Sequence, residues 1–328
     1  MRAIVLALAA LLCVPCFAAT PAAAAACRES PVTAPALARL RAALAHARFV
    51  AYEPTGLTVS GEGRISPASE ASIRGDLAVL RKHFDALVTY DAIHGAENIP
   101  AVAASLGYQA VIVGVWNPLV AGEVEAASDA ARRYPHLVAG IALGNELIFT
   151  HRAEVPALVR TIAQLHERLP KVPLTTTEPF HTYRESAGGL LPELDFLLVN
   201  VHPIFQPWFR EAPDSTRAQF VVNVVTELNG SYCGPILVKE TGVPSAPAGA
   251  GFTEERQASF YLELARRFPS SPERAFAYFA AFDAPWRESD ASTVPHPEEA
   301  HWGLYTVARR AKSVVGTIPT LSAGRVPP

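Results

Sequence analysis

The sequence lacks several features that mark common classes of protein. Its 328 residues carry 28 Lys and Arg against 31 Asp and Glu, a formal net charge of −3, with the two signs mixed along the chain. Such a chain has no basic face, so nucleic acid is not an expected partner. Beyond the first residues, no apolar run approaches the roughly 20 residues that a transmembrane helix needs.

The signatures of several enzyme classes are also missing. No G-x-S-x-G elbow occurs, which argues against a serine hydrolase. No metal-ligand spacing such as H-E-x-x-H is found, so we expect no metal ion and no cofactor. The segment Gly61-Glu-Gly63-Arg-Ile-Ser66 lacks the third glycine of a dinucleotide-binding fingerprint, which argues against a doubly wound sheet.

The chain opens with the features of an export signal. Met1-Arg2 gives a short positive region, residues 3–14 are apolar without a charge, and alanine-rich residues follow before Cys27. We therefore expect residues 1–26 to be a signal peptide, with export to the periplasm or the cell exterior and no stable membrane insertion after cleavage. Ala26-Cys27 can also be read as a lipoprotein junction, although Ala24 stands where leucine is expected.

Two of the four cysteines remain once the signal is removed, Cys27 and Cys233. An exported protein can hold a disulfide. The sequence leaves two alternatives open: a disulfide between these residues, or two unpaired cysteines that behave as small hydrophobic side chains.

The remaining chain alternates apolar runs of strand length with helical patterns. The 3,4-spaced apolar residues between 155 and 165 illustrate the helices. Continuous apolar runs are typical of parallel strands that are covered on both faces. Residues 27–318 are therefore predicted to form a single-domain (β/α)₈ barrel, and residues 319–328, rich in Pro, Gly and Ser, a loosely ordered tail. The eight predicted strands are 49–52, 86–90, 110–116, 138–143, 174–177, 196–201, 236–238 and 275–282.

Two glutamates end strands of this predicted barrel. Glu146 follows the fourth strand and Glu240 the seventh, 94 residues later, which is close to three βα units of about 30 residues. Strands four and seven face each other across the mouth, where barrel enzymes keep their chemistry. Two carboxyl groups at this end suggest an acid/base residue and a nucleophile, which a retaining glycosidase holds roughly 5–5.5 Å apart.

The motifs around these glutamates resemble those of glycoside hydrolase family 17, the β-1,3-glucanases and related glucanosyltransferases. The two central motifs are Ala142-Leu-Gly-Asn-Glu146 and Lys239-Glu-Thr-Gly-Val-Pro-Ser245. Four more segments agree in order and spacing, so that the resemblance covers nearly the whole mature chain: Thr89-Tyr-Asp91, Val199-Asn-Val-His-Pro203, Phe279-Ala-Ala-Phe-Asp-Ala-Pro-Trp286 and Glu299-Ala-His-Trp-Gly-Leu-Tyr305.

The resemblance implies a role for each matching residue. Glu146 matches the general acid/base and Glu240 the nucleophile, Asn145 matches the asparagine that holds the sugar 2-hydroxyl, and Glu299 matches a carboxylate close to the acid/base. The chain departs from the family at Val243, where Trp or Phe is frequent, and at His202-Pro203, where Tyr-Pro is common.

Chemistry adds expectations for the neighbouring residues. An acid that keeps its proton near neutrality needs a pKa raised by burial or by a nearby carboxylate, here Glu299 beside Glu146, whereas Lys239 or a tyrosine would keep Glu240 ionised. Asp91 and Asp283 are expected to orient sugar hydroxyls or neighbouring side chains. Glu178 is equally compatible with a substrate contact and a structural hydrogen bond, and His202 is expected to bond the sugar or Glu240.

Aromatic residues near the strand ends suit a carbohydrate, because sugar rings stack their C–H faces on aromatic rings. For any one of them a place in the core is an equal alternative. Trp286 and Trp302 lie inside the family motifs and are predicted to be stacking platforms, and Tyr90 to contact substrate. The aromatic residues expected on the mouth side are Tyr90, Trp116, Phe180, Tyr183, Phe205, Trp208, Trp286 and Trp302.

Together these observations predict a retaining β-1,3-glucanase acting on β-glucan polysaccharide or oligosaccharide. A β-1,3-glucan transglycosylase with the same residues is the alternative, since the two differ only in whether water or a sugar hydroxyl attacks the glycosyl-enzyme. A non-catalytic carbohydrate-binding protein is a further alternative, but it would have no reason to keep both glutamates.

Overall fold

A closed ring of eight parallel strands forms the centre of the molecule. The computed structural model describes residues 30, 32–60, 63–119, 122–289 and 296–321. The strands follow the ring in chain order, and β1 closes it by pairing with both β4 and β10. They are β1 (Phe49–Ala51), β4 (Ala86–Val88), β5 (Ala110–Val115), β6 (Val138–Asn145), β7 (Leu174–Pro179), β8 (Leu197–Asn200), β9 (Ile236–Thr241) and β10 (Arg274–Tyr278).

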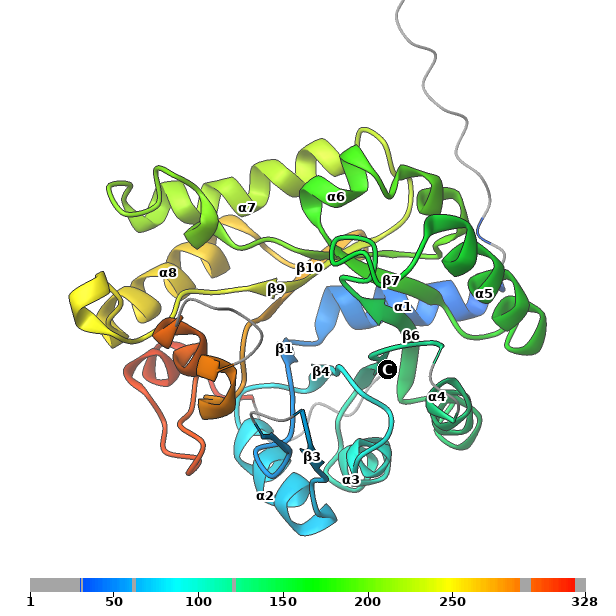
Figure 1. The fold of residues 1–328 in the computed structure, drawn as a ribbon, viewed down its shortest axis with the longest axis horizontal. Helices are drawn as coiled ribbons and strands as arrows, with labels where there is room; N and C mark the ends of the chain where they lie inside the picture. The colour runs from blue at the N-terminus through cyan, green and yellow to red at the C-terminus, as the bar shows by residue number, and fades with distance from the viewer. Residues whose placement is uncertain (1–29, 31, 61–62, 120–121, 290–295, 322–328) are drawn as a thin grey trace, which may run out of the picture.

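Helices surround this ring, as Figure 1 shows. The seven outer helices are α2 (Glu70–Leu80), α3 (Ile99–Ser105), α4 (Glu123–Arg133), α5 (Val155–Arg168), α6 (Phe180–Glu185), α7 (Asp214–Leu228) and α8 (Glu254–Arg267). The predicted (β/α)₈ barrel is therefore confirmed, and each of the eight predicted strands is present with shifted ends. Strands β6 and β9 run further than predicted and carry Asn145 and Glu240 inside their last residues.

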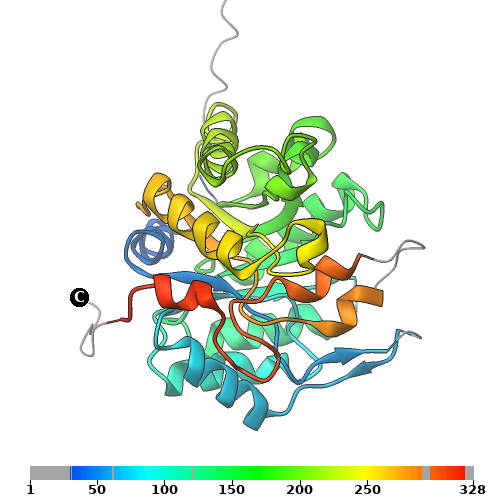
Figure 2. The same cartoon turned by 90° about the vertical axis from the view of Figure 1, so that its left-hand side faces the viewer.

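A helix that the sequence analysis did not predict closes the bottom of the barrel. Helix α1 (Ala34–His46) packs Leu40 and Leu44, both fully buried, against the interior residues Phe49 and Ala86 at the beginnings of their strands. Figure 2 shows α1 at one end of the barrel and the hairpin of β2 (Thr58–Val59) and β3 (Ile65–Ser66) at the other. Helix α1 thus covers the end of the barrel where the strands begin and leaves open the end where they terminate.

The two ends of the chain lie only partly within the described residues. Pro319 and Leu321, at the start of the expected loose tail, are hydrogen-bonded to Arg48 and Lys82. Cys233 is disulfide-bonded, but Cys27 and the predicted signal peptide lie outside the described residues, so the pairing and the signal stay predictions. None of the helices within 30–321 that the structure describes is long and apolar enough to cross a membrane.

One buried carboxylate ties the first strand to the last loop. Asp76 of α2 is fully buried and accepts hydrogen bonds from the Tyr52 hydroxyl at 3.0 Å, from Thr55, and from the Arg309 guanidinium at 2.7 Å. A buried carboxylate of this kind stabilises the fold only while its partners are present, and removing it leaves those partners unsatisfied.

We predict that Asp76→Ala lowers the free energy of unfolding by about 3 kcal/mol, since Arg309 and the Tyr52 hydroxyl both lose their acceptor. Chemical denaturation followed by circular dichroism measures the change. Glu70→Ala is the matched control, because it breaks an exposed pair with Arg74 and should cost at most about 0.5 kcal/mol. Equal losses in the two variants would show that the Asp76 network does not stabilise the fold.

Candidate active site

Two glutamates meet at the open end of the barrel, one at the end of β6 and one on β9. Glu146 has a φ of +55°, in the left-handed region that residues other than glycine seldom adopt, and Gly144, two residues earlier, has a φ of +98°. A Cβ at Gly144 would lie 2.4 Å from the Leu147 side chain, so only glycine fits this turn. Backbone strain of this kind clusters at functional sites. The lack of space for a side chain at position 144 therefore explains why the Gly144-Asn-Glu146 motif begins with glycine.

Glu240 is buried but surrounded by donors and positive charge. The His202 ring donates from Nε2 to Glu240 Oε2 at 3.2 Å, and Lys239 Nζ lies 3.5 Å from Oε1. Burial alone would raise the pKa of Glu240, but the His202 hydrogen bond and the Lys239 charge outweigh it and lower the pKa to about 2. The expected hydrogen bond of His202 to Glu240 is confirmed, and so is the expected help from Lys239.

Glu146 has the opposite electrostatics. Burial raises its pKa first and the charge of Glu240 raises it further, while the Asn200 amide, which donates to Glu146 Oε1 at 2.8 Å, acts against both. The expectation that Glu299 supplies the neighbouring charge is wrong: the carboxylate that acts on Glu146 is Glu240. Glu299 instead accepts a hydrogen bond from the Trp302 indole at 3.1 Å. The surroundings of the two carboxyl groups therefore shift their pKa values in opposite directions.

A buried lysine links the two strand ends. Lys239 Nζ donates to Asn145 Oδ1 at 2.5 Å and lies over the Tyr90 ring, 3.9 Å from its centre. Because Asn145 Oδ1 accepts the hydrogen bond from Lys239, the amide NH₂ group is the part of Asn145 that remains to bond a ligand. Lys239 thus helps to lower the pKa of Glu240 and also orients the Asn145 amide.

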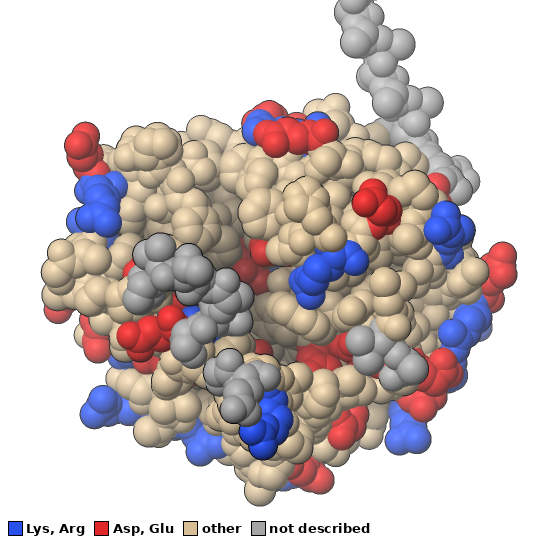
Figure 3. Space-filling view, viewed as in Figure 1, with Lys and Arg blue, Asp and Glu red and all other residues tan. Residues whose placement is uncertain are grey.

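Glu240 and Asn145, the neighbour of Glu146, line a cleft of about 400 Å³. Figure 3 shows this hollow at the centre of the molecule, with acidic side chains inside it. Trp116 and Phe205 on its walls keep 44% and 66% of their surface exposed, and Trp286 is partly exposed. The residues lining it include Glu53, Tyr90, Trp116, Asn145, Phe205, Glu240, Phe279, Trp286, Arg287, His296 and Glu299.

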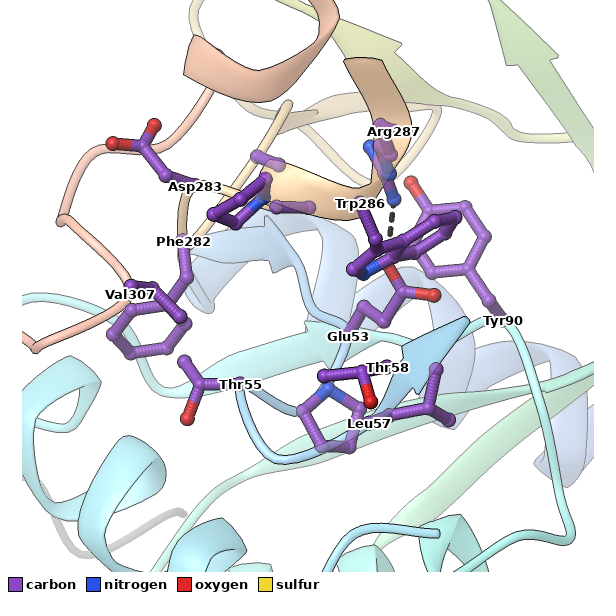
Figure 4. Close-up of a pocket in the computed structure, with 14 residues that line it drawn as sticks. Glu53, Thr55, Leu57, Thr58, Tyr90, Phe282, Asp283, Trp286, Arg287 and Val307 are labelled. Atoms are coloured by element: carbon purple, nitrogen blue, oxygen red, sulfur yellow. Dashed lines mark hydrogen bonds and ion pairs between the residues drawn. The ribbon is translucent and has the colours of Figure 1, made fainter. Parts of the chain in front are cut away.

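A second cavity of about 290 Å³ adjoins the cleft and shares Tyr90 and Trp286 with it. Glu53 and Arg287 also line both cavities and form an ion pair of 2.7 Å, and Figure 4 shows Arg287 reaching Glu53. Sequence reasoning missed this ion pair, although Glu53 follows the first predicted strand and Arg287 follows Trp286. The strand-end position was the signal that could have found them. It missed Asn200 as well, at the end of β8.

Three of the predicted carboxylates bond to neighbouring protein groups rather than face the cleft. Glu178 is fully buried and accepts from the backbone N–H groups of Ile148 and Phe149, so the substrate contact considered for it is wrong and the structural hydrogen bond is correct. Asp283 pairs with Lys312, and in Figure 4 its carboxylate points away from Glu53 and Tyr90.

Asp91 orients its own loop. Its carboxylate accepts from Ile93 N–H at 2.7 Å and bonds the His94 ring at 2.8 Å, and it lies beside the buried Glu123. Glu123 in turn accepts from the backbone of Trp116 and Asn117. Of the two roles considered for Asp91 and Asp283, the structure supports the orientation of neighbouring protein groups.

Several of the expected aromatic residues do not line the cleft. Trp302 is only 2% exposed and packs edge-on against His202 and Phe279, so the expectation of an exposed platform is wrong for it. Tyr183 is buried and donates to the backbone of β7 and β8. Tyr90, Trp116, Phe205 and Trp286 do lie at the cleft. Among the described residues, no group of three or more His, Cys, Asp and Glu could hold a metal ion.

Comparison with known proteins places this geometry in context. The family model of the BtgE/BtgC glycoside hydrolase domain matches residues 50–303. A glucan 1,3-beta-glucosidase of Arthroderma benhamiae is 26% identical over 262 residues, which cover 74% of this chain and 83% of that protein.

Solved structures share the fold at lower identity. An active-site mutant of Rhizomucor miehei β-1,3-glucanosyltransferase, in complex with laminaritriose, has a TM-score of 0.66 and 20% identity over 83% of this chain and 97% of that one. A β-glucuronidase of an uncultured Clostridium sp. has a TM-score of 0.63 and 16% identity over 83% of this chain and 49% of that one. The predicted relationship to glycoside hydrolase family 17 is confirmed, and the chain belongs to the BtgE/BtgC glycoside hydrolase family.

Proposed function

We propose that this protein is a retaining glycosidase that cleaves β-1,3-glucosidic bonds, with Glu146 as general acid/base and Glu240 as nucleophile. The observation that carries the proposal is the opposite pKa shift of the two glutamates at the ends of β6 and β9. Two carboxyl groups with separated pKa values are what a retaining glycosidase needs.

The first step uses both groups at once. Glu146 gives its proton to the glycosidic oxygen, so that the aglycone leaves as an alcohol, while a Glu240 oxygen attacks the anomeric carbon and forms a glycosyl ester. Lys239 and His202 hold Glu240 ionised until it attacks. The Asn145 amide is placed to bond the 2-hydroxyl, a contact that strengthens in the transition state of such reactions.

The second step follows from the same electrostatics. Once Glu240 is esterified, its negative charge is gone, and with it one of the two causes that raise the pKa of Glu146. The Glu146 carboxylate left by the first step is then a base, which takes a proton from water as the water oxygen attacks the anomeric carbon. Free sugar leaves, Glu240 returns as a carboxylate, and Glu146 is protonated again.

The substrate class rests on the family and on the character of the cleft. The relatives described above include a glucan 1,3-beta-glucosidase and a transferase bound to laminaritriose. The exposed rings of Trp116 and Phe205 and the partly exposed ring of Trp286 suit stacking on glucose units. We propose β-1,3-glucan as substrate and, from the N-terminal sequence, action in the periplasm or outside the cell.

Transfer to a sugar acceptor is the second candidate. Trp116 and Phe205 offer exposed ring surface beside Glu240, which can hold an incoming sugar as well as a leaving one. Products longer than the starting laminari-oligosaccharide, dominant even at low substrate concentration, would identify the protein as a transferase.

We predict that Glu146→Gln and Glu240→Gln each reduce kcat on laminarin by about 10³-fold or more, because a proton donor or the nucleophile is lost. Reducing-sugar release from laminarin, xylan and cellulose measures this, with the exposed Glu227→Gln as control. Normal turnover of laminarin by either cleft variant would contradict the assignment, and cleavage of xylan or cellulose with laminarin intact would contradict the substrate.

Azide separates the two roles. Glu240→Gly with azide should give a glycosyl azide of inverted configuration, since azide replaces the nucleophile directly. Glu146→Gly should give the retained configuration, since azide then attacks the ester on Glu240. Nuclear magnetic resonance of the product reads the configuration, and the same anomer from both variants would contradict the assignment.

The pH dependence of kcat/KM should respond separately to two residues of the β8 end. His202→Ala removes a bond that lowers the pKa of Glu240, so this pKa rises and the acidic limb moves to higher pH. Asn200→Ala removes a bond that lowers the pKa of Glu146, so the alkaline limb moves to higher pH. Profiles on a laminari-oligosaccharide measure both limbs. Asn200→Ala moving the acidic limb alone would contradict this division.

A further inference from the structure

A third cavity lies outside the barrel mouth, between the loop after β8 and helices α7 and α8. Its volume is about 330 Å³, which falls within the size range of small-molecule sites. The loop contributes Trp208, the first turn of α7 contributes Ser215 and Thr216, and Gln219, Asn223 and Arg267 lie deeper along the two helices. None of these residues takes part in the chemistry proposed above.

The aromatic side of this cavity is fixed in place. Trp208 is partly exposed and stands edge-on to Phe220 of α7, with ring centres 5.3 Å apart. Phe220 in turn packs against Phe180 of α6 at 5.6 Å. A ring braced from behind in this way keeps its free surface available to a ligand at little cost in conformational entropy.

The polar side of the cavity is a chain of two amides that ends at one arginine. Gln219 donates from Nε2 to Asn223 Oδ1 at 3.0 Å, and Arg267 donates to Gln219 Oε1 at 3.1 Å. Glu263 pairs with Arg267 at 2.9 Å and also with Arg266 at 2.7 Å, so it offsets part of the Arg267 charge. The other polar residues of the lining are neutral, and a neutral ligand with many hydroxyl groups finds amide and hydroxyl partners there beside an aromatic ring. That combination is the chemistry of carbohydrate binding.

The loop that carries Trp208 also reaches the catalytic cleft. Phe205 lies three residues earlier, at the end of the 3₁₀ turn Pro203–Phe205, and lines the cleft with 66% of its surface exposed. Directly after Trp208, Phe209 is buried under the Arg217 guanidinium, 4.4 Å from the ring centre, and Arg217 donates to the Phe209 carbonyl. The loop is thus anchored, with one aromatic ring toward the cleft and another toward the outer cavity.

We infer that the cavity around Trp208 is a secondary binding site for a neutral glucan chain that extends beyond the catalytic cleft. A chain that leaves the cleft past Phe205 meets Trp208 a few residues along the same loop, so that one polysaccharide molecule can hold both sites. The naming of the glucan as β-1,3-linked rests on the proposed function. The chemistry of the site requires only a neutral polysaccharide.

Binding is tested in the Glu240→Gln background, where turnover cannot consume the ligand. Affinity electrophoresis through gels containing laminarin should show retention weakened about fivefold by Trp208→Ala, the loss of one stacking contact. Trp208→Phe should keep part of the retention, and Asn223→Ala should weaken it. Leu262→Ala, an exposed apolar residue of α8 that does not line the cavity, is the matched control and should match the parent. Thermal unfolding of each variant confirms the fold.

Kinetics in the wild-type background distinguish the two sites. Trp208→Ala should raise KM for laminarin about fivefold and leave kcat/KM for laminaritriose, which is short enough for the cleft alone, within about twofold. Equal retention of the Trp208→Ala and Leu262→Ala variants by laminarin would overturn the inference, as would equal losses on laminarin and laminaritriose.

Failure of the proposed function gives a different result. In that case the wild-type protein cleaves neither laminarin nor laminaritriose, and no variant is retained by laminarin. Gels that contain lichenan, xylan or glucomannan are therefore run in parallel. Trp208-dependent retention in any of them supports the secondary site independently of the reaction, and its absence in all of them overturns it.

Discussion

The arrangement of the site depends on one ionised carboxylate held inside the barrel. Glu240 is 7% exposed, and taking such a charge out of water costs several kcal/mol unless donors and opposite charge surround it. Lys239, adjacent on the same strand, and His202, from the neighbouring strand end, provide both. The charge of Glu240 then raises the pKa of Glu146. A single buried anion thus adds to the effect of burial on the pKa of its partner.

The asymmetry of the two glutamates comes from β8, the strand that pairs with β7 on one side and β9 on the other. Asn200 is in register with Glu240 but donates to Glu146, and His202, two residues later, donates to Glu240. A slip of one residue in β8 would exchange which side chains face the barrel interior, so both hydrogen bonds depend on the same register. The register of β8 therefore determines both hydrogen bonds that shift the pKa values of the two glutamates.

The sequence predicted the barrel and the glutamate pair because both follow from one-dimensional signals. Continuous apolar runs give buried parallel strands, and a carboxylate just after such a run lies at the open end. The position of a residue at a strand end does not show which way its side chain points. Glu178 also ends a strand, yet its carboxylate turns to backbone N–H groups, and Trp302 lies in a family motif but packs under His202. Asn200, Glu53 and Arg287 also stand at or near strand ends, but the groups that they bond lie far apart from them in sequence, so only the fold shows these pairs.

The proposed attack of Glu240 on the anomeric carbon requires the configuration of the cleaved bond to be retained. Proton nuclear magnetic resonance can follow the first seconds to minutes of laminarihexaose cleavage, before mutarotation mixes the anomers. If Glu240 is the nucleophile, the β-anomer of the newly formed reducing end appears first and the α-anomer only later. The α-anomer appearing first would mean inversion by direct attack of water, and would contradict the role assigned to Glu240.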